Sequence, residues 1–146
     1  MENKKHIFAY IAGIIDGEGS LCIAKKSKGG YQPLIEVTMC DPSVPNFLKK
    51  EVGGFIFIRK RNYLNPKWQD ANTWGLTGQK NIVKLLENIT PYLVQKKKEA
   101  ALITEFCKSR FDIMKLPRNE RVFVKRHSEI YNQLKSIHSP ITFKFL

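Results

Sequence analysis

The sequence has few cysteines and no long apolar run. Its three cysteines, Cys22, Cys40 and Cys107, are an odd number with no CxxC spacing, which argues against a disulfide framework and a structural zinc site. No segment approaches the roughly 20 apolar residues that a membrane-spanning helix needs. The uncharged run at residues 7–15 follows two lysines, as in a signal peptide, but two acids come directly after it. We therefore expect a soluble, intracellular protein in a reducing compartment, with no membrane partner.

Acidic residues are scarce as well. The 13 Asp and Glu are outnumbered by 25 Lys and Arg, which leaves a formal net charge of +12. Positive charges in such excess repel one another, so the first hypothesis is a polyanionic partner. Hydrophobic residues make up 42% of the chain, too many for a disordered basic tail. The length of 146 residues suits one domain, and we expect residues 1–146 to form it.

Hydrophobic periodicity predicts an opening helix and then two copies of a strand–strand–helix unit. The expected elements are a helix at 5–16, strands at 20–28 and 31–39, a helix at 42–52 with Asp41 as its N-cap, strands at 55–61 and 71–78, and a helix at 82–89. Thr90-Pro91 is expected to begin a further helix through about Arg110, and residues 122–137 to form a last one. The fold class is therefore α+β, with two antiparallel hairpins covered by helices on one face.

The uncovered face of the hairpins carries positive charge. Residues 20–32 and 55–69 together contain seven cations and no acid, a pattern that suits the neutralisation of phosphates. Polar side chains such as Gln32 and Thr38 alternate outward on the same strands, and a β-ribbon can read base edges in the major groove with such groups. The alternative is a solvated edge that lysines protect against strand pairing. We consider nucleic acid the better interpretation.

Small residues form a strip on the first helix. Ala9, Gly13 and Gly17 recur every four residues, with Ala12 and Asp16 beside them, so another helix can approach closely along this face. If that helix belongs to a symmetry-related copy, two copies of the following acid, residue 18, meet near the two-fold axis. The two carboxylates would repel each other there, so this arrangement requires bound cations.

Residues 11–19, IAGIIDGEG, resemble the LAGLIDADG motif of homing endonucleases. The segments FLKKEVGG, WGLTG and PYLVQKKKEA are similar to the single-motif branch of that family. The resemblance covers residues 7–110, and residues 111–146 match only a C-terminal helix. It implies an αββαββα protomer that dimerises through the motif helices, with the sheets forming a saddle over duplex DNA.

The resemblance also implies roles for individual residues. Glu18, the second acid, would bind a divalent metal together with Gly17 and position water for attack on a phosphodiester. Asp16, the first acid, would mainly hold the end of the helix. In the family, polar residues near the end of the second strand help to order active-site water. Met39 cannot do this, so Thr38 or Asp41 would take that role. The implied cofactor is Mg²⁺, with Mn²⁺ or Ca²⁺ possible in a non-cleaving complex.

Lys96 corresponds to a lysine that the family places near the active centre. On a helix from residue 91, it would lie in the middle of an otherwise apolar arc formed by Leu93, Ala100, Ile103 and Cys107. A charged group among apolar side chains is unfavourable unless it has a partner, and a scissile phosphate or its bound water would be such a partner. The alternative is a lysine that extends past the core to solvent.

The family comparison and the strand alternation together predict the DNA contacts. Arg59 and Arg61 share one face of the third strand and match guanine bidentately, although each could equally contact a phosphate. The full set expected to contact DNA is Ser20, Cys22, Lys26, Lys28, Gln32, Glu36, Thr38, Phe57, Arg59, Arg61, Lys67, Thr73 and Thr77.

The sequence thus predicts a homodimeric, Mg²⁺-dependent, sequence-specific DNA endonuclease of the LAGLIDADG type. The resemblance implies a long pseudo-palindromic site, 3′ overhangs, and an origin in a mobile intron or intein-like element. The first alternative is a binding protein on the same scaffold that does not cleave, such as an intron RNA maturase or a DNA-binding regulator. A basic surface that serves only solubility is the second.

Overall fold

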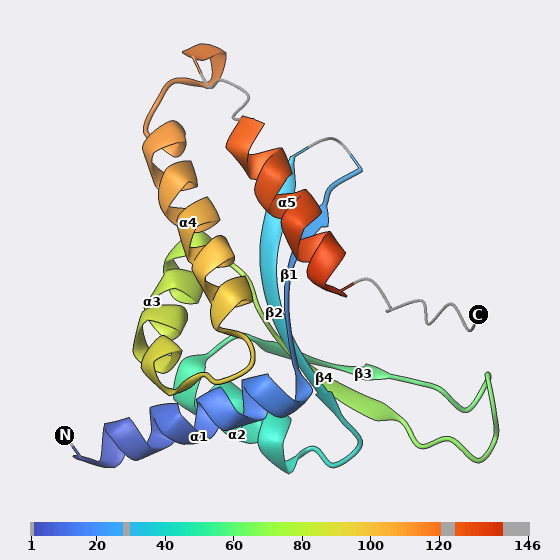
Figure 1. Ribbon diagram of the computed structural model, residues 1–146. Coiled ribbons are helices and arrows are strands. Elements are labelled where there is room, and N and C mark those ends of the chain that lie inside the picture. The colour runs from blue at the N-terminus through green and yellow to red at the C-terminus, as the bar shows by residue number, and fades with distance from the viewer. Residues whose placement is uncertain (1, 28–29, 121–124, 139–146) are drawn as a thin grey trace, which may run out of the picture.

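A computed structural model describes residues 2–27, 30–120 and 125–138. Its helices and strands follow the predicted order (Figure 1). They are α1 (Glu2–Glu18), β1 (Gly19–Lys25), β2 (Tyr31–Met39), α2 (Ser43–Val52), β3 (Phe55–Arg59), β4 (Ala71–Leu76), α3 (Gln79–Ile89), α4 (Lys97–Met114) and α5 (Lys125–His138), with short 3₁₀ turns η1 (Thr90–Tyr92) and η2 (Arg118–Glu120). None of these described helices is long and apolar enough to cross a membrane.

The four strands form one antiparallel sheet in the order β1-β2-β4-β3. The two hairpins meet along β2 and β4, where Val37 lies opposite Trp74 and Thr38 opposite Thr73. From this seam the hairpins fan apart, and β3 and β4 continue into a long arm that projects away from the helices (Figure 1). The predicted α+β architecture is confirmed.

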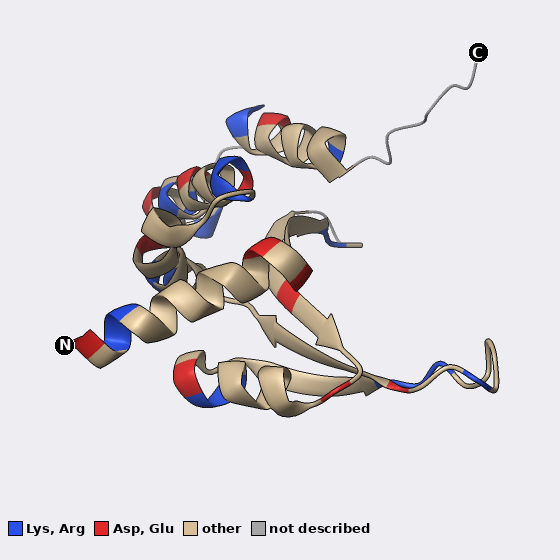
Figure 2. Cartoon of the chain, turned by 60° about the horizontal axis from the view of Figure 1, so that its bottom comes forward, with Lys and Arg blue, Asp and Glu red and all other residues tan. Residues whose placement is uncertain are grey.

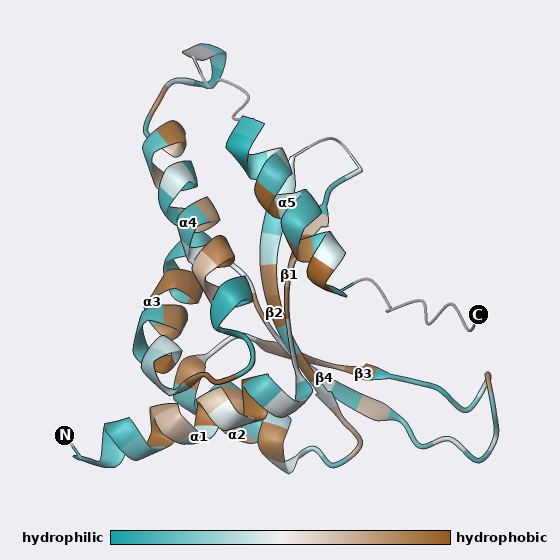
Figure 3. Cartoon of the chain, viewed as in Figure 1, coloured by the Kyte–Doolittle hydropathy of each residue, from teal (hydrophilic) through white to brown (hydrophobic). Residues whose placement is uncertain are grey.

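Helices cover one face of the sheet and build the core there. Pro33, Ile35 and Val37 on β2 are buried, whereas the residues between them are only partly covered, as their alternation predicted. Trp74 on β4 is fully buried, and its indole Nε1 donates a hydrogen bond to the carbonyl of Gly53, 2.7 Å away. Figure 3 shows apolar residues concentrated where the helices meet β1 and β2, and a mostly hydrophilic arm. We call the opposite, helix-free side of the sheet the open face.

Several predicted boundaries were wrong by a few residues. The first, third and fourth strands end at Lys25, Arg59 and Leu76, earlier than expected, and the first helix is longer than residues 5–16. The first hairpin already turns at Lys26, whose N–H donates to the carbonyl of Gly30. A strand ends where cross-strand pairing ends, and periodicity does not mark that point.

The prediction that Thr90-Pro91 begins a helix through Arg110 was also wrong. The hydroxyl of Thr90 donates back to the Leu86 carbonyl, so this residue closes α3 instead of opening a new helix. Leu93 is extended, with ψ 141°, and α4 begins only at Lys97. The last helix is described from Lys125, because residues 121–124 lie outside the described residues.

Candidate active site and nucleic-acid interface

The chain passes directly from α1 into β1, and Gly19 makes this passage possible. A Cβ atom on Gly19 would lie 2.7 Å from both the Cα and the carbonyl oxygen of Ile15, so a larger residue would collide with backbone. Gly19 is then paired with Val37 of β2. This tight passage fixes Glu18 as the last residue of the helix, directly before the first paired residue of β1.

Asp16 faces inward and binds the segment that leads into α4. Its carboxylate accepts hydrogen bonds from the backbone N–H groups of Val94 (2.7 Å), Gln95 (3.1 Å) and Lys96 (2.9 Å). Partial burial acts to raise the pKa of Asp16, but the three N–H groups and the charge of Lys96 outweigh it, so its pKa is lowered. The ionised carboxylate therefore holds the end of α1 against the start of α4.

Lys96 completes this junction from the other side. Its Nζ donates to the carbonyl oxygens of Ile15 (2.9 Å) and Asp16 (2.8 Å), which belong to the last turn of α1. A cation is favourable there because these carbonyls have no partners within the helix and carry the negative end of its dipole. The helical arc proposed for Lys96 does not exist, since the residue precedes α4. Its place beside the motif acids agrees with the resemblance, and its catalytic role stays a prediction.

Glu18 faces away from this junction. Its side chain is exposed, and among the described residues it has no hydrogen bond or ion pair. Figure 2 shows the acidic residues gathered at this end of α1. Two acids separated by one residue thus have opposite environments, one bonded within the chain and one free to meet a ligand.

The small-residue strip is only partly as predicted. Ala9, Gly13 and Gly17 are exposed, and a Cβ on either glycine would meet no atom within 4 Å. Ala12 has 0% exposure, so the prediction that it lies in a dimer interface was wrong; it packs in the chain's own core. Asp16 likewise directs its carboxylate to α4 instead of to a partner. The open part of the strip is Ala9, Gly13 and Gly17.

One chain by itself offers little to a metal. No group of three or more His, Cys, Asp or Glu residues is placed to hold an ion within the described ranges. Both oxygens of Asp16 are already hydrogen-bonded, so the carboxylate available here is that of Glu18. Oxygen donors of this kind suit a hard cation such as Mg²⁺. The further ligands would have to come from the main chain at Gly17, from a second copy, or from phosphate.

The supporting residues at the end of β2 fall into two groups. Thr38 lies on the open face, where its Oγ1 shares a 2.9 Å hydrogen bond with Oγ1 of Thr73. Met39 points the other way and packs against the core, so it offers no polar atom to the site. Asp41 accepts a hydrogen bond from the Ser43 N–H at 2.7 Å. Hydrogen bonding to the side chain of Ser43, and then to its N–H, lowers the pKa of Asp41. Thr38 thus keeps a hydroxyl on the open face, and its supporting role stays a prediction, whereas Asp41 bonds to the first residue of α2.

The open face carries most of the residues predicted to contact DNA. Strand register aligns Ser20 with Glu36 and Gly75, and Thr38 with Thr73 and Phe57. Thr73 is on this face but has 0% exposure, so the prediction that it contacts DNA is not supported by its surroundings. The remaining residues placed on this face with accessible surface are Ser20, Cys22, Gln32, Glu36, Thr38, Phe57 and Arg59.

The two arginines predicted to read bases are held differently. The guanidinium of Arg59 lies 5.4 Å from the ring centre of Phe57 and 3.9 Å from Glu36, and its side chain is 54% exposed. Arg61 donates to the Sγ of Cys40 (3.4 Å) and to the carbonyl of Gln69 (3.3 Å). It therefore ties the base of the arm to the end of β2. Arg59 remains the better placed of the two to reach a base.

The cations predicted on the hairpins are exposed where the structure describes them. Lys26 lies at the turn of the first hairpin and Lys67 in the segment between β3 and β4, both exposed, with Thr77 partly covered beyond β4. Lys28 lies outside the described residues. Figure 2 shows positive charge along the arm and mixed charge on the helices α3 and α4. Burial raises the pKa of Cys22, so this thiol on the open face stays neutral.

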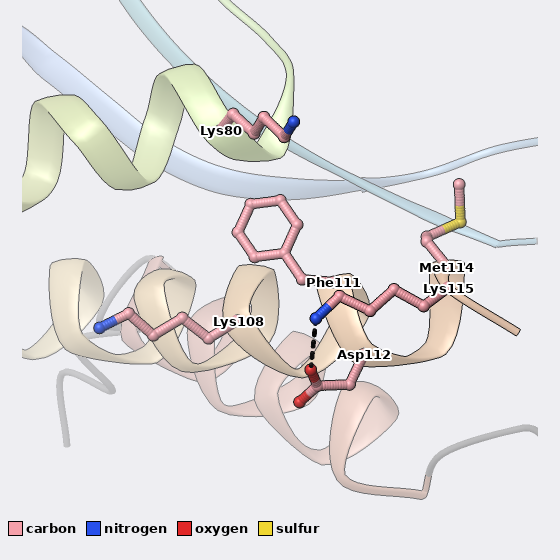
Figure 4. Close-up of a pocket in the computed structure, with 6 residues that line it drawn as sticks. All are labelled: Lys80, Lys108, Phe111, Asp112, Met114 and Lys115. Atoms are coloured by element: carbon pink, nitrogen blue, oxygen red, sulfur yellow. Dashed lines mark ion pairs between the residues drawn. The ribbon is translucent and has the colours of Figure 1, made fainter.

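A separate hollow of about 700 Å³ lies between the start of α3 and the end of α4 (Figure 4). Lys80, Lys108 and Lys115 line it, and Lys115 pairs with Asp112 at 3.7 Å. Neither motif acid borders it. The hollow is thus distinct from the end of α1.

The sequence predictions missed two features of the site. Gly19 was read only as part of the motif, although its lack of a Cβ sets the position of Glu18. Phe55 was not assigned to the open face, yet it pairs with Gly75 there. The alternation of Phe55, Phe57 and Arg59 along one strand was a signal that could have identified it.

Comparisons with known proteins agree with this architecture. No protein-family model and no curated protein matches the chain. Among solved structures it is similar to the archaeal intron-encoded homing endonuclease I-Vdi141I complexed with DNA, with 20% identity, 90% of this chain and 83% of that chain covered, and a TM-score of 0.69.

Two further solved structures have the same arrangement. The homing endonuclease I-CvuI, in complex with its target in the presence of Ca, is 18% identical, with 94% of this chain and 98% of that one covered and a TM-score of 0.61. I-SmaMI, bound to uncleaved DNA target in the presence of calcium ions, is 22% identical, with coverages of 88% and 42% and a TM-score of 0.60. The chain therefore has the LAGLIDADG homing endonuclease fold, as its motif predicted.

Proposed function

We propose that the chain is a sequence-specific DNA endonuclease that works as a homodimer and depends on a divalent cation. The observation that carries this proposal is the pair of motif acids. Asp16 and Lys96 lock the end of α1, while Glu18 is left exposed beside a helix-free sheet face whose hairpins end in exposed cations. A carboxylate next to a phosphate-binding surface repels its ligand unless a cation lies between them.

The dimer supplies what one chain lacks. The exposed strip of Ala9, Gly13 and Gly17 allows a second copy of α1 to pack closely, which would bring two copies of Glu18 together near the axis. Two such acids provide one site for each DNA strand. Two-fold symmetry also implies a pseudo-palindromic target, and the dimer would carry twice the +12 charge of one chain.

Each residue of the site then has a role. The Glu18 carboxylate and the Gly17 carbonyl would hold Mg²⁺, which supplies charge neutralisation at the scissile phosphate. Asp16 and Lys96 fix the helix end, and the hydroxyl of Thr38 would help to order the attacking water. The 3′ overhangs and the origin in a mobile element are proposals that rest on the family resemblance, and the single domain over residues 1–146 is one that rests on the chain length.

One observation favours a second candidate, a DNA- or RNA-binding protein that does not cleave. Met39 packs into the core where the resemblance implies a polar residue that helps order water. A protein without that group could keep the binding face and lose the chemistry. The two candidates differ in one measurable property, metal-dependent strand cleavage.

The test incubates the full chain with duplex DNA that spans its own insertion site, rejoined, in Mg²⁺ or in EDTA. We expect double-strand cleavage in Mg²⁺ alone and its loss in Glu18→Gln, by at least about a hundredfold. Binding without any metal-dependent nicking, or a Glu18→Gln protein that cuts as well as the parent, would contradict the enzyme. Tighter binding to the host intron RNA than to the duplex would identify the binding protein.

A further inference from the structure

Two phenylalanine rings are exposed on the open face of the second hairpin. Phe55 and Phe57 keep 39% and 37% of their surface accessible, and their rings lie nearly parallel, 6.1 Å apart between centres. Phe55 covers Gly75 on the neighbouring strand. A Cβ at Gly75 would lie 2.5 Å from Cζ of Phe55, so glycine is what allows the ring to lie across the sheet.

This aromatic pair is an apolar surface at the base of the arm, next to Arg59. The guanidinium of Arg59 lies over the Phe57 ring, and the nearby acid Glu36 is within 3.9 Å of that same arginine. Toward the first hairpin, the open face continues with Cys22 and Leu34, which are paired across β1 and β2. A contiguous exposed apolar patch is a candidate binding surface, because leaving it in water is unfavourable.

The charges around the rings indicate what binds them. Arg59 borders the pair, with Lys60 next in the sequence, and polar groups that could read base edges, such as Thr38, share the same face. A duplex offers one apolar group in its major groove, the C5-methyl of thymine, and phenylalanine is a side chain that contacts it. The phosphates on either side of the groove would complement the cations.

We propose that Phe55 and Phe57 are specificity-determining residues that select A·T pairs by packing against thymine methyl groups. This inference rests on the proposed function, since it requires the open face to bind duplex DNA. Arg59, held over Phe57, then keeps the ring in place and reaches the adjacent base or phosphate. Unpaired bases stacked on the rings are the competing occupant.

The experiment removes only the methyl group. Duplexes that the full chain selects from a random pool are resynthesised with deoxyuridine in place of each thymine in turn, and affinity is measured at fixed salt. We expect one or more positions per half-site to lose affinity about fourfold, as for one buried methyl group. This scan uses the unaltered protein, so it does not depend on how a variant folds.

The same scan with Phe55→Ala and Phe57→Ala assigns the effect to the rings. At the sensitive positions, the ratio of thymine to deoxyuridine affinity should fall from about fourfold to about one. Tyr63→Ala is the matched control, because Tyr63 is an aromatic residue of the same arm with 77% exposure that lies outside the strands. It should leave the ratio unchanged. Thermal unfolding checks that each variant is folded.

The outcomes separate this inference from the proposed function. Equal affinity for thymine and deoxyuridine at every position, or sensitivity that persists in both phenylalanine variants, overturns the methyl contact while leaving DNA binding intact. Tighter binding to the single strand than to the duplex overturns it in favour of base stacking. If no duplex is selected from the pool, the proposed function fails as well.

Discussion

The two sides of the end of α1 have opposite chemistry, although neighbouring residues build them. On the inner side, both carboxylate oxygens of Asp16 accept hydrogen bonds from backbone N–H groups of its own chain. Lys96 donates hydrogen bonds to carbonyls in the last turn of the helix. On the outer side, Gly13, Gly17 and Glu18 are exposed. The first motif acid is thus bonded within the fold of one chain, whereas the second stays exposed, where we propose that it meets a partner, a cation or DNA.

Gly13→Leu should have the largest effect, because it places a side chain on the outer side. Within one chain the new Cβ meets no atom within 4 Å, and leucine favours a helix over glycine by up to about 1 kcal/mol. We therefore expect a well-folded monomer whose double-strand cleavage falls by at least about a hundredfold, since the two sites are no longer aligned. Sedimentation equilibrium and plasmid linearisation measure the two effects.

The control for this prediction is Ala101→Leu, at an exposed small residue of α4. It adds similar bulk away from the strip and should leave both assembly and cleavage unchanged. If Gly13→Leu remains dimeric and cuts normally, the outer side of α1 is not the dimer interface.

Asp16→Ala should act on the inner side and lower stability. It removes the acceptor of three backbone hydrogen bonds, and bonds to a charged group contribute more than neutral ones, so we expect a loss of about 2–3 kcal/mol in the free energy of unfolding. Glu18→Gln, at an exposed side chain, should change it by no more than about 0.5 kcal/mol. Urea unfolding at pH 7 compares them, and equal losses would remove the contrast between the two acids.

The smallest expected effect is the pH dependence of the stability difference between the parent and Asp16→Ala. The pKa of Asp16 is lower in the folded chain than its usual value, so its contribution is fully present above about pH 4 and is lost as the pH falls through the lower, folded value. Water screens this partly exposed group, which keeps the change small. The stability gap between parent and Asp16→Ala should be constant from pH 7 to about 5 and narrow below about 4. A gap that widens in acid would contradict the assignment.

Local pattern was sufficient to predict much of the fold. Alternation along β2 predicted which side chains are buried, and the motif predicted an α+β arrangement that the structure has. The error at Thr90 arose because a Thr-Pro pair can close one helix as well as open another, and a hydrogen bond to Leu86 decides between them. Such a bond depends on backbone geometry that composition does not reveal.

The site was less predictable where it depends on distant residues. Asp16 and Val94 are 78 positions apart, so no local pattern could pair them. Ala12 was assigned to the interface because it lies near the strip in sequence, yet a turn of about 100° per residue points it into the core instead. The open-face role of Phe55 depended on its partner Gly75 across the sheet, which only the register reveals.

The central claim is that each Glu18 of a dimer serves one DNA strand. Its most direct test combines one parent chain and one Glu18→Gln chain, carrying different affinity tags, in a purified mixed dimer. This dimer is incubated with supercoiled plasmid that contains the target site and Mg²⁺. The account predicts that nicked circles accumulate and that linear DNA forms at least about tenfold more slowly than with the parent dimer. Linear DNA at the parental rate would contradict it.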